Sequence, residues 1–259
     1  MGKIVIGVDS STQSTKAIAW DINGKALAEG RCDIPLHNPS LEKFEQNVED
    51  WWRAFCVSTQ ELCQKIDINE VDGLAISNQR ETLAKLDSSG KEVYPATVWM
   101  DKRSVKEVEE LNSIMGEGRI HEITGRPKDP CPCLYRVLWM KNHEKKFFDQ
   151  IDCFADVQAF LVHRLSGEFN TGWISSDPHG MFDVVNKCWS QEILEQLSID
   201  ESRLPKSFKP GSMIGKVNLA ASKETGLKEG TPIFAAGGDG QLAWLGPNCT
   251  KSDRAYINL

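Results

Sequence analysis

The sequence lacks several features that would place it in a familiar class. Its 259 residues contain no run approaching the ~20 apolar residues that cross a bilayer. The apolar start at residues 4–8 is too short for a secretory signal, and no small-residue cleavage site follows it. No Gly-x-x-x-x-Gly-Lys-[Ser/Thr] phosphate loop occurs either. These absences exclude a membrane partner and a P-loop nucleotide site, and they predict a cytoplasmic protein.

Metal-binding and disulfide patterns are also missing, although the chain has eight cysteines and five histidines. There is no Cys-x-x-Cys pair and no His-x-x-x-His pattern, and Cys131-Pro132-Cys133 is the closest cysteine pair. We therefore expect reduced, mostly buried thiols rather than a zinc site. The net charge of −7, with Lys and Arg scattered along the chain, argues against nucleic-acid binding.

The first third of the chain alternates short apolar segments typical of β-strands with one long amphipathic helix. We expect strands at residues 4–9, 17–21, 25–33, 71–77 and 82–87. The helix is predicted over residues 47–66 with Asn47 as its N-cap, and Asn23-Gly24 is typical of a hairpin turn. Three antiparallel strands, a crossover helix and a further strand predict a mixed α/β sheet.

The rest of the chain is predicted to be helical first and then mixed again. Helices are expected at residues 104–114, 134–142, 156–165 and 190–197. Gly167 is a plausible stop for the third of these. A buried strand at 231–236, a Gly-rich turn at 237–240, a helix at 241–246 and a strand at 254–259 follow. A strand that stops at the last residue suggests that the chain is cut there.

Asp9 ends the first predicted strand, and hydroxyl and amide side chains fill the turn after it at residues 10–15. A carboxylate followed by hydroxyls and exposed backbone N–H groups suits a phosphate and its magnesium. Taken alone, the same segment is more typical of an ordinary hairpin rich in turn-forming residues.

Three further motifs could hold a polyhydroxylated ligand. Arg80 and Glu81 follow an amide and together offer donors and acceptors to neighbouring hydroxyls. Trp99 could stack on the apolar face of a sugar, with Asp101 close by. Asp239 lies in the Gly-rich turn, where glycines allow a substrate to approach the backbone. Each motif alone has a structural alternative, such as a polar loop or a core tryptophan.

The order of these motifs resembles the FGGY family of carbohydrate kinases. An acid in an opening β-turn-β is followed by Asn-Gln-Arg-Glu at 78–81, Val-Trp-Met-Asp-Lys-Arg at 98–103 and Gly-Gly-Asp-Gly-Gln at 237–241. The resemblance runs from Ile4 to Leu259. It implies an α/β fold with an actin-like (ribonuclease H-like) mixed β-sheet flanked by helices, with a helical insertion. It also implies a sugar-binding domain at residues 1–245 and the truncated start of an ATP-binding domain at 246–259.

The resemblance further implies a role for each motif residue. Nucleotide contacts would come from Asp9, Thr12, Gln13, Ser14 and Lys16. Substrate contacts would come from Arg80, Glu81, Trp99, Asp101, Asp239 and Gln241. ATP and Mg²⁺ are the implied cofactors, with Asp9 and Asp239 as metal ligands. Asp239 would be the catalytic residue that takes the proton from the attacking primary hydroxyl.

The implied reaction is ATP-dependent phosphorylation of a small sugar or polyol, and the substrate stays open. Asn-Gln-Arg-Glu resembles the glycerol kinase branch, yet Cys131 and Gly240 replace an aromatic and an amide expected there. Residues 176–183 are closer to xylulose kinases. A pentulose such as xylulose fits at least as well as a polyol such as glycerol or erythritol.

Two other interpretations compete with an active kinase. One is a non-catalytic sugar-binding or regulatory module of the same actin-like fold, and the other is a fragment of an actin-like ATPase or chaperone. The family's second phosphate loop and adenosine motif are missing from this sequence. We therefore expect the chain alone to bind sugar weakly and to phosphorylate nothing. The sequence leaves a homodimer open.

Overall fold

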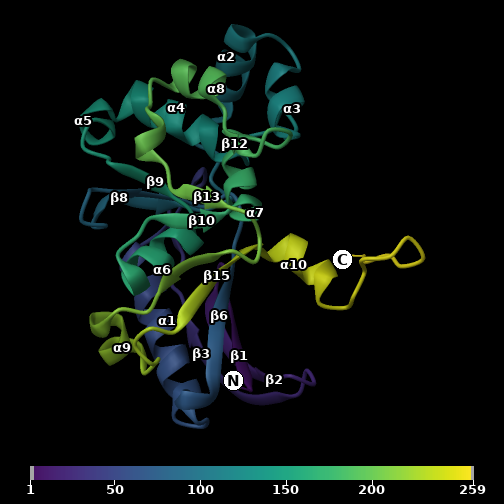
Figure 1. Cartoon of the computed structure of the whole chain (residues 1–259). Coiled ribbons are helices and arrows are strands. Elements are labelled where there is room, and N and C mark those ends of the chain that lie inside the picture. Colours follow the sequence, from purple (N-terminus) through teal and green to yellow (C-terminus); the bar gives the residue numbers. More distant parts are fainter. Residues whose placement is uncertain (1–2, 258–259) are drawn as a thin grey trace.

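The computed structural model of the chain describes residues 3–257. A six-stranded mixed β-sheet forms the framework of one half of the molecule (Figure 1). In sheet order its strands are β14 (Met213–Lys216), β15 (Pro232–Gly238), β6 (Val71–Asn78), β1 (Ile4–Ser10), β2 (Ser14–Asp21) and β3 (Ala26–Asp33). Strand β2 runs antiparallel to both of its neighbours, β1 and β3, whereas β6 runs parallel to β1 and β15 parallel to β6. The predicted mixed α/β sheet is confirmed.

Side-chain alternation along β1 gives this sheet two different faces. Ile4, Ile6 and Val8 are buried, and they belong to the core that the sheet shares with the helices. Val5 and Asp9 point to the opposite face because side chains alternate with a period of two. Val5 is 50% exposed there. The helices on the first face are α1 (Val48–Cys63), α6 (Val157–Ser166) and α9 (Leu219–Thr225).

A second sheet and a group of helices form the other half, as Figure 1 shows at its upper end. The five strands of this sheet, in order, are β4 (His37–Ser40), β5 (Lys43–Gln46), β8 (Glu92–Thr97), β7 (Leu83–Leu86) and β9 (Cys153–Ala155). The helices are α2 (Val105–Met115), α3 (Arg119–Thr124), α4 (Cys133–His143), α5 (Lys145–Phe148) and α8 (Gln191–Leu197). They enclose a second hydrophobic core, which confirms the predicted helical insertion.

Short elements complete the fold. They are β10 (Asn170–Gly172), β11 (Phe182–Asp183), β12 (Cys188–Trp189), β13 (Lys206–Phe208), α7 (Trp173–Ser176) and the 3₁₀ turns η1 (Ile68–Glu70), η2 (Asp177–His179) and η3 (Glu201–Arg203). Helix α7 packs against β15, and η2 follows it directly. Within residues 3–257, no helix has the length and apolar character to cross a bilayer.

The predicted helix ends are partly right. Gly167 stops α6 in the left-handed conformation, with φ +91°. Asn47 precedes α1 as expected, but its side chain forms no capping hydrogen bond. Glu92 of β8 accepts instead from the first helical N–H, that of Val48, at 3.2 Å. A carboxylate from a distant strand therefore satisfies a donor that the sequence assigned to the local cap.

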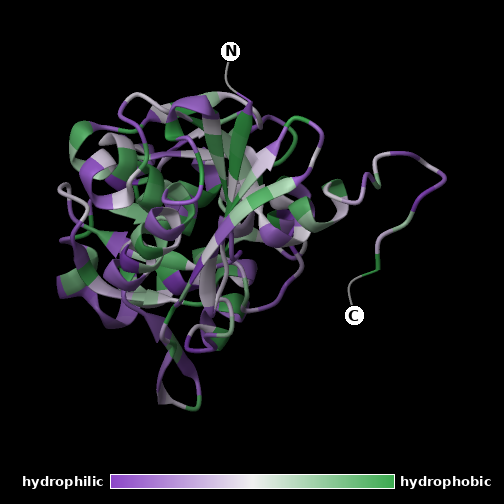
Figure 2. Cartoon of the chain, turned by 90° about the horizontal axis from the view of Figure 1, so that it is seen from below, coloured by the Kyte–Doolittle hydropathy of each residue, from purple (hydrophilic) through white to green (hydrophobic). Residues whose placement is uncertain are grey.

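Two predictions near the end of the chain are wrong. Residues 237–240 form no Gly-rich turn, because β15 continues through Gly238 and α10 (Asp239–Leu245) begins at the next residue. Residues 254–257 are exposed and form no strand, since a strand needs a hydrogen-bonded neighbour that the described chain does not bring there. The last two residues of that predicted strand, 258–259, lie outside the described residues. The segment after α10 extends away from the body (Figure 2).

Candidate functional site

The turn between β6 and β7 carries Arg80 and Glu81 in a strained conformation. Glu81 has φ +46°, a left-handed value that is uncommon for a residue other than glycine. The fully buried Arg136 of α4 donates through Nη2 to the Glu81 and Cys131 carbonyl oxygens and through Nη1 to the Val98 carbonyl oxygen, 3.0 Å away. This buried guanidinium therefore fixes the backbone that presents the Arg80–Glu81 pair.

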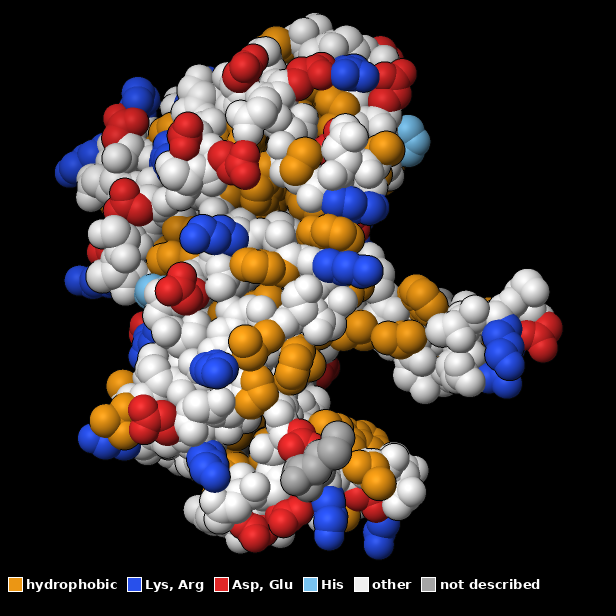
Figure 3. All heavy atoms as spheres, in the orientation of Figure 1, with side chains coloured by type: hydrophobic (Ala, Val, Ile, Leu, Met, Phe, Trp, Pro, Cys, Tyr) orange, Lys and Arg blue, Asp and Glu red, His pale blue; other side chains and the backbone are white. Residues whose placement is uncertain are grey.

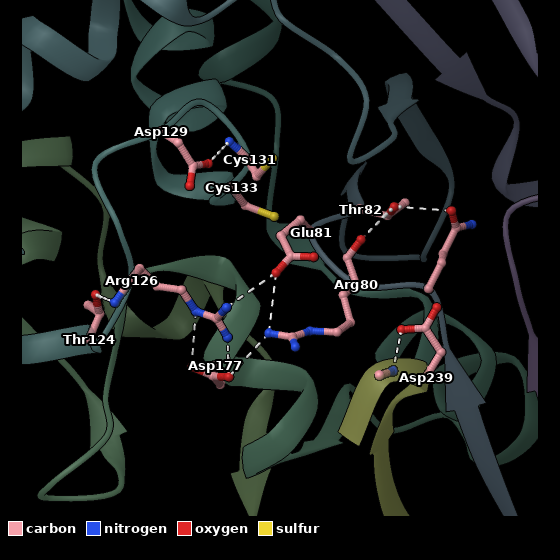
Figure 4. A network of polar contacts seen from close by, with 12 residues as sticks. Arg80, Glu81, Thr82, Thr124, Arg126, Asp129, Cys131, Cys133, Asp177 and Asp239 are labelled. Atoms are coloured by element: carbon pink, nitrogen blue, oxygen red, sulfur yellow. Dashed lines mark hydrogen bonds and ion pairs between the residues drawn. The ribbon is translucent and has the colours of Figure 1, made fainter. Parts of the chain in front are cut away.

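Four charged side chains meet at this turn (Figure 4). Arg80 Nη2 lies 3.3 Å from Glu81 Oε1 and 3.4 Å from Asp177 Oδ2. Arg126 donates from Nε to Asp177 Oδ1 at 3.2 Å, from Nη2 to Asp177 Oδ2, and from Nη1 to Glu81 Oε1 at 3.4 Å. Burial raises the pKa of Glu81, and the charges of Arg80 and Arg126 oppose that rise. The cluster balances two guanidinium groups with two carboxylates.

Arg126 and Asp177 belong to this cluster, although the sequence analysis assigned a role to neither. Arg126 follows Gly125, the left-handed C-cap of α3, and Asp177 opens η2 directly after α7, which packs against β15. Asp177 falls within residues 176–183, whose sequence only distinguished one kinase branch from another. In the sequence, Arg126 and Asp177 are single charged residues in two separate turn-like segments. Nothing in either segment indicates that the two side chains meet.

Asp239 reaches the same region from the other side. It opens α10 directly after β15, and its Oδ1 accepts from the Gly240 N–H at 2.7 Å. Although the residue is exposed, nearby protein atoms displace part of the water around its carboxylate, and this desolvation raises the pKa of Asp239. The negative charge of Asp9 adds to the rise, whereas the Gly240 N–H and Arg80 oppose it.

The glycines before Asp239 make room for side chains. A Cβ on Gly238 would lie 2.5 Å from Arg80 Cγ, and one on Gly237 would lie 2.4 Å from Ile174 Cβ. The predicted reason for these glycines was close approach of a substrate to the backbone. The structure instead shows that the Arg80 side chain lies across Gly238. Because Gly238 has no side chain, Arg80 after β6 can lie close to Asp239 after β15.

Several polar atoms of the site are buried without a hydrogen-bond partner among the described residues. They include the donor Arg80 Nε and the acceptors Gln241 Oε1 and Asp9 Oδ1. Buried polar atoms are nearly always paired, so such atoms mark where a ligand or an ion would bind. Gln241 also lines a cavity of about 360 Å³ together with Asp177. The unpaired donor and acceptor therefore lie beside the four-charge cluster.

Asp9 lies at the end of β1 on the open face of the sheet. Its Oδ2 accepts from Ser11 Oγ at 2.5 Å, and the residue lines a cavity of about 270 Å³ with Lys16 and Leu242. In Figure 3 this face lies in the hollow between the projecting α10 segment and the lower end of the sheet. Mg²⁺ binds through one or two carboxylates while keeping several waters, so Asp9 with Asp239 nearby fits such an ion. No cage of three or more His, Cys, Asp or Glu residues occurs within residues 3–257.

The predicted nucleotide contacts lie together in the β1–β2 hairpin. Thr12 and Ser14 are partly exposed, and Gln13 is exposed at the turn. Lys16 is on β2, with its Nζ 3.1 Å from Glu29 on β3. These side chains are accessible from solvent, and their contact with a nucleotide stays a prediction.

Trp99 contacts the hairpin that holds the predicted nucleotide contacts. Its indole Nε1 donates to Thr12 Oγ1 at 3.1 Å, and 45% of the residue is exposed. The ring also lines a cavity of about 330 Å³ with Phe44 and Cys131. An exposed indole edge beside a small cavity suits stacking on a carbon chain.

The structure argues against Asp101 as a substrate ligand. The residue is 1% exposed, and its two carboxylate oxygens accept from Arg103 Nε and Nη2 at 2.8 and 2.7 Å. Oδ2 also accepts from the Phe44 N–H at 2.9 Å. Because the protein occupies both oxygens, we correct the prediction: Asp101 holds Arg103 and the segment before α2.

Comparisons with known proteins agree with this geometry. Residues 4–246 match the family described as FGGY family of carbohydrate kinases, N-terminal domain. A glycerol kinase of Thermococcus kodakarensis is 29% identical, over 95% of this chain and 50% of its own length. An autoinducer-2 kinase of Yersinia enterocolitica is 26% identical, over 95% of this chain and 47% of its own length.

A solved structure shows the same fold. The xylulose kinase from Lactobacillus acidophilus superposes with a TM-score of 0.91 at 28% identity, over 97% of this chain and 51% of that chain. The chain thus spans about half the length of the curated relatives it matches. With its mixed sheet, its helical insertion and a family match over residues 4–246, this chain belongs to the FGGY family of carbohydrate kinases.

Proposed function

We propose that this chain is the sugar-binding lobe of an ATP-dependent kinase that phosphorylates a primary hydroxyl of a small sugar or polyol. The observation that carries the proposal is the unpaired polar set beside Asp239. Arg80 Nε is a buried donor and Gln241 Oε1 a buried acceptor, and neither has a partner within the described residues. A hydroxyl both donates and accepts, so neighbouring hydroxyls of one ligand would satisfy both atoms.

In this proposal Asp239 is the general base. A sugar hydroxyl is barely acidic, and a positioned carboxylate that takes its proton contributes roughly 10²–10⁴-fold to the rate. Desolvation raises the pKa of Asp239, and a higher pKa makes its carboxylate a stronger base. Arg80 and Glu81 would orient the hydroxyls, while Trp99 would cover the carbon chain. The turn after β6 positions Arg80 and Glu81, and the start of α10 positions Asp239.

Asp9 and Asp239 would hold the magnesium that accompanies ATP, Asp9 partly through water. When bound, Mg²⁺ neutralises the charge of the phosphates. Thr12, Gln13, Ser14 and Lys16 are proposed to approach the phosphates from the β1–β2 hairpin. A reaction that consumes ATP is consistent with a cytoplasmic location, which is part of the same proposal.

The relatives are about twice as long as this chain, and their second half enters the proposal as the main nucleotide lobe. We propose that residues 246–259 begin that lobe and that residues 1–245 form the sugar lobe. Adenosine and most phosphate contacts would then come from sequence that corresponds to the second half of the relatives.

The substrate class is a pentulose or a polyol of three to five carbons. Relatives named for glycerol, xylulose and autoinducer-2 lie at similar identity, so none of them selects a single compound. A non-catalytic sugar-binding module is the alternative. The carboxylates of Asp9 and Asp239 favour the kinase, because a pure sugar binder needs no pair of acids beside its site.

A thermal-shift panel of glycerol, erythritol, pentitols, xylulose, ribulose and hexoses tests the proposal on this chain. A ligand that binds only the folded state stabilises it by about 2.7 kcal/mol at a hundredfold excess over Kd. We expect a shift with a small polyol or ketose, and Arg80→Gln should abolish it. The exposed Arg119, which pairs with Glu192, offers the matched control Arg119→Gln, which should keep it. A flat panel would contradict the sugar site.

A further inference from the structure

Arg126 uses its whole guanidinium group on carboxylates of the protein itself. Nε and Nη2 hold the two oxygens of Asp177 as a fork, and Nη1 lies 3.4 Å from Glu81 Oε1. A guanidinium fork is the group that proteins use to bind a carboxylate in a bidentate manner. In this chain an internal acid already occupies the fork.

Asp177 also faces the space where a ligand would lie. It lines the cavity of about 360 Å³ together with Gln241, whose Oε1 is buried and unpaired. The Asp177 side chain is 23% exposed, so a ligand in the cavity meets its carboxylate directly. Lys187 lines the same cavity, but the residue is exposed and its ammonium donates to the Val184 carbonyl oxygen. Water screens the Lys187 charge, which leaves Asp177 as the dominant charge facing the ligand.

Apart from the screened Lys187, the cations nearest the cavity already face carboxylates of the protein. Arg80 and Arg126 face Glu81 and Asp177, and Asp239 adds a further carboxylate on the other side of Arg80. A sugar acid bound there would place one more carboxylate beside two guanidinium groups whose charges are already balanced by Glu81 and Asp177. Partly buried charges are weakly screened, so this arrangement repels a carboxylate. An uncharged polyol meets no such penalty.

We propose that Asp177 is a specificity-determining residue that occupies Arg126 and thereby restricts the cavity to uncharged sugars and polyols, excluding sugar acids. The inference rests on the proposed function, because it presumes that this cavity is the sugar site. Removing the Asp177 carboxylate frees the Arg126 fork for the carboxylate of an aldonate.

Matched ligand pairs test this by isothermal titration calorimetry on the chain. Xylitol and xylonate, ribitol and ribonate, and erythritol and erythronate differ only in a terminal CH₂OH or COO⁻ group. The wild-type chain should bind at least one polyol and none of the acids. Asp177→Ala, which also opens space, should raise affinity for an acid by about tenfold or more. Asp177→Asn keeps the shape without the charge, and it should move affinity in the same direction.

A double variant separates a freed fork from a general change of charge. Arg126→Gln in the Asp177→Ala background restores the net charge of the pair and should abolish the gained acid binding. Glu122→Gln removes an exposed charge from α3 and should gain nothing. Wild-type binding of an acid as tight as that of its matched polyol would overturn the proposal, whether or not the variants fold. Folded Asp177 variants, checked by circular dichroism, that gain no acid binding would overturn it too.

The same experiment keeps the two proposals apart. If the wild type binds no polyol but Asp177→Ala binds an aldonate, the sugar proposal fails while the exclusion of sugar acids by Asp177 stands. If the wild type binds polyols and acids equally, the sugar proposal stands while the role of Asp177 fails.

Discussion

The indole Nε1 of Trp99 donates a 3.1 Å hydrogen bond to the hydroxyl of Thr12, which lies 87 residues earlier in the chain. The bond joins the segment after β8, predicted to line the sugar, to the hairpin predicted to approach the phosphates. Two sites that the sequence presents as separate motifs therefore share one polar contact.

Loss of this contact should weaken sugar binding. Thr12→Val removes the acceptor while keeping the shape, and it should raise the sugar Kd by about 2- to 10-fold, the range for one hydrogen bond. Trp99→Phe removes the donor and should have at least as large an effect. Calorimetry on both variants and their combination gives a double-mutant cycle. Strictly additive effects would show that the bond does not couple the two segments.

Gly238→Ala should displace Arg80 and weaken sugar binding by more than about tenfold, since a hydrogen bond to a charged group is worth about 1.5–3 kcal/mol. The added Cβ would lie 2.5 Å from Arg80 Cγ, whereas the backbone of Gly238 (φ −64°, ψ 147°) accepts alanine. Gly240→Ala is the matched control, because its Cβ would meet nothing closer than Arg80 Nη1 at 3.8 Å. Equal affinities for the two variants would contradict the assignment of Arg80 to the ligand.

Asp239→Asn should abolish phosphoryl transfer in an enzyme that joins this lobe to a nucleotide lobe, with a loss of about 10²–10⁴-fold. The amide cannot take the hydroxyl proton, yet it keeps the size of the side chain. Sugar affinity should therefore change by less than about threefold. Coupled-enzyme turnover and calorimetry measure the two quantities, and near-normal turnover would refute the role of Asp239 as base.

Lys85 should make stability depend on pH below about 10.4. The residue is fully buried on β7, and its Nζ donates to the Pro95 carbonyl oxygen and to Thr97 Oγ1, each at 2.8 Å. Burial lowers the pKa of Lys85 well below its ordinary value, and the charges of Arg103 and Arg136 lower it further. In the unfolded chain the Lys85 ammonium keeps its proton up to about pH 10.4. Between the lower folded pKa and this value, the unfolded chain therefore binds more protons than the folded chain.

The free energy of unfolding should therefore rise with pH from the folded pKa of Lys85 to about 10.4, by at most about 1.4 kcal/mol per pH unit. Lys85→Met should lose this rise, and the exposed Lys223→Met should keep it. Urea unfolding at several pH values measures the slopes. Parallel curves for Lys85→Met and the wild type would contradict a depressed pKa.

Sequence patterns predicted the elements whose periodicity is strong. The alternation in β1 and the helical spacing in α2, α4 and α6 gave bounds within one or two residues of the structure. The short strands β4 and β5 escaped prediction because they contain few apolar residues, and β8 escaped because Pro95 interrupts its apolar residues. The glycines at 237–238 favoured a turn, yet they belong to a strand. Glycine is needed there because a Cβ would collide with the side chains of Ile174 and Arg80.

Parts of the candidate site could not be predicted from local sequence. Arg80, Glu81 and Asp239 follow strands and were recognisable from position and chemistry. The pairing of Arg126 with Asp177 spans 51 residues and depends on how α3 and η2 meet, which no spacing reveals. Asp101 shows the opposite error, since a carboxylate near a candidate tryptophan is engaged by a buried arginine.

The buried Arg136 holds three loops through their main-chain carbonyl oxygens, those of Glu81, Val98 and Cys131. None of these hydrogen bonds depends on the identity of the side chain at the contacted position. Substitutions at the rim of the pocket can therefore accumulate while the framework beneath them keeps its shape. Because Arg136 stays in place beneath these loops, their side chains can change, and the substrate with them, while the backbone keeps its conformation. Position 136 is therefore far less tolerant of substitution than the loop positions that it holds.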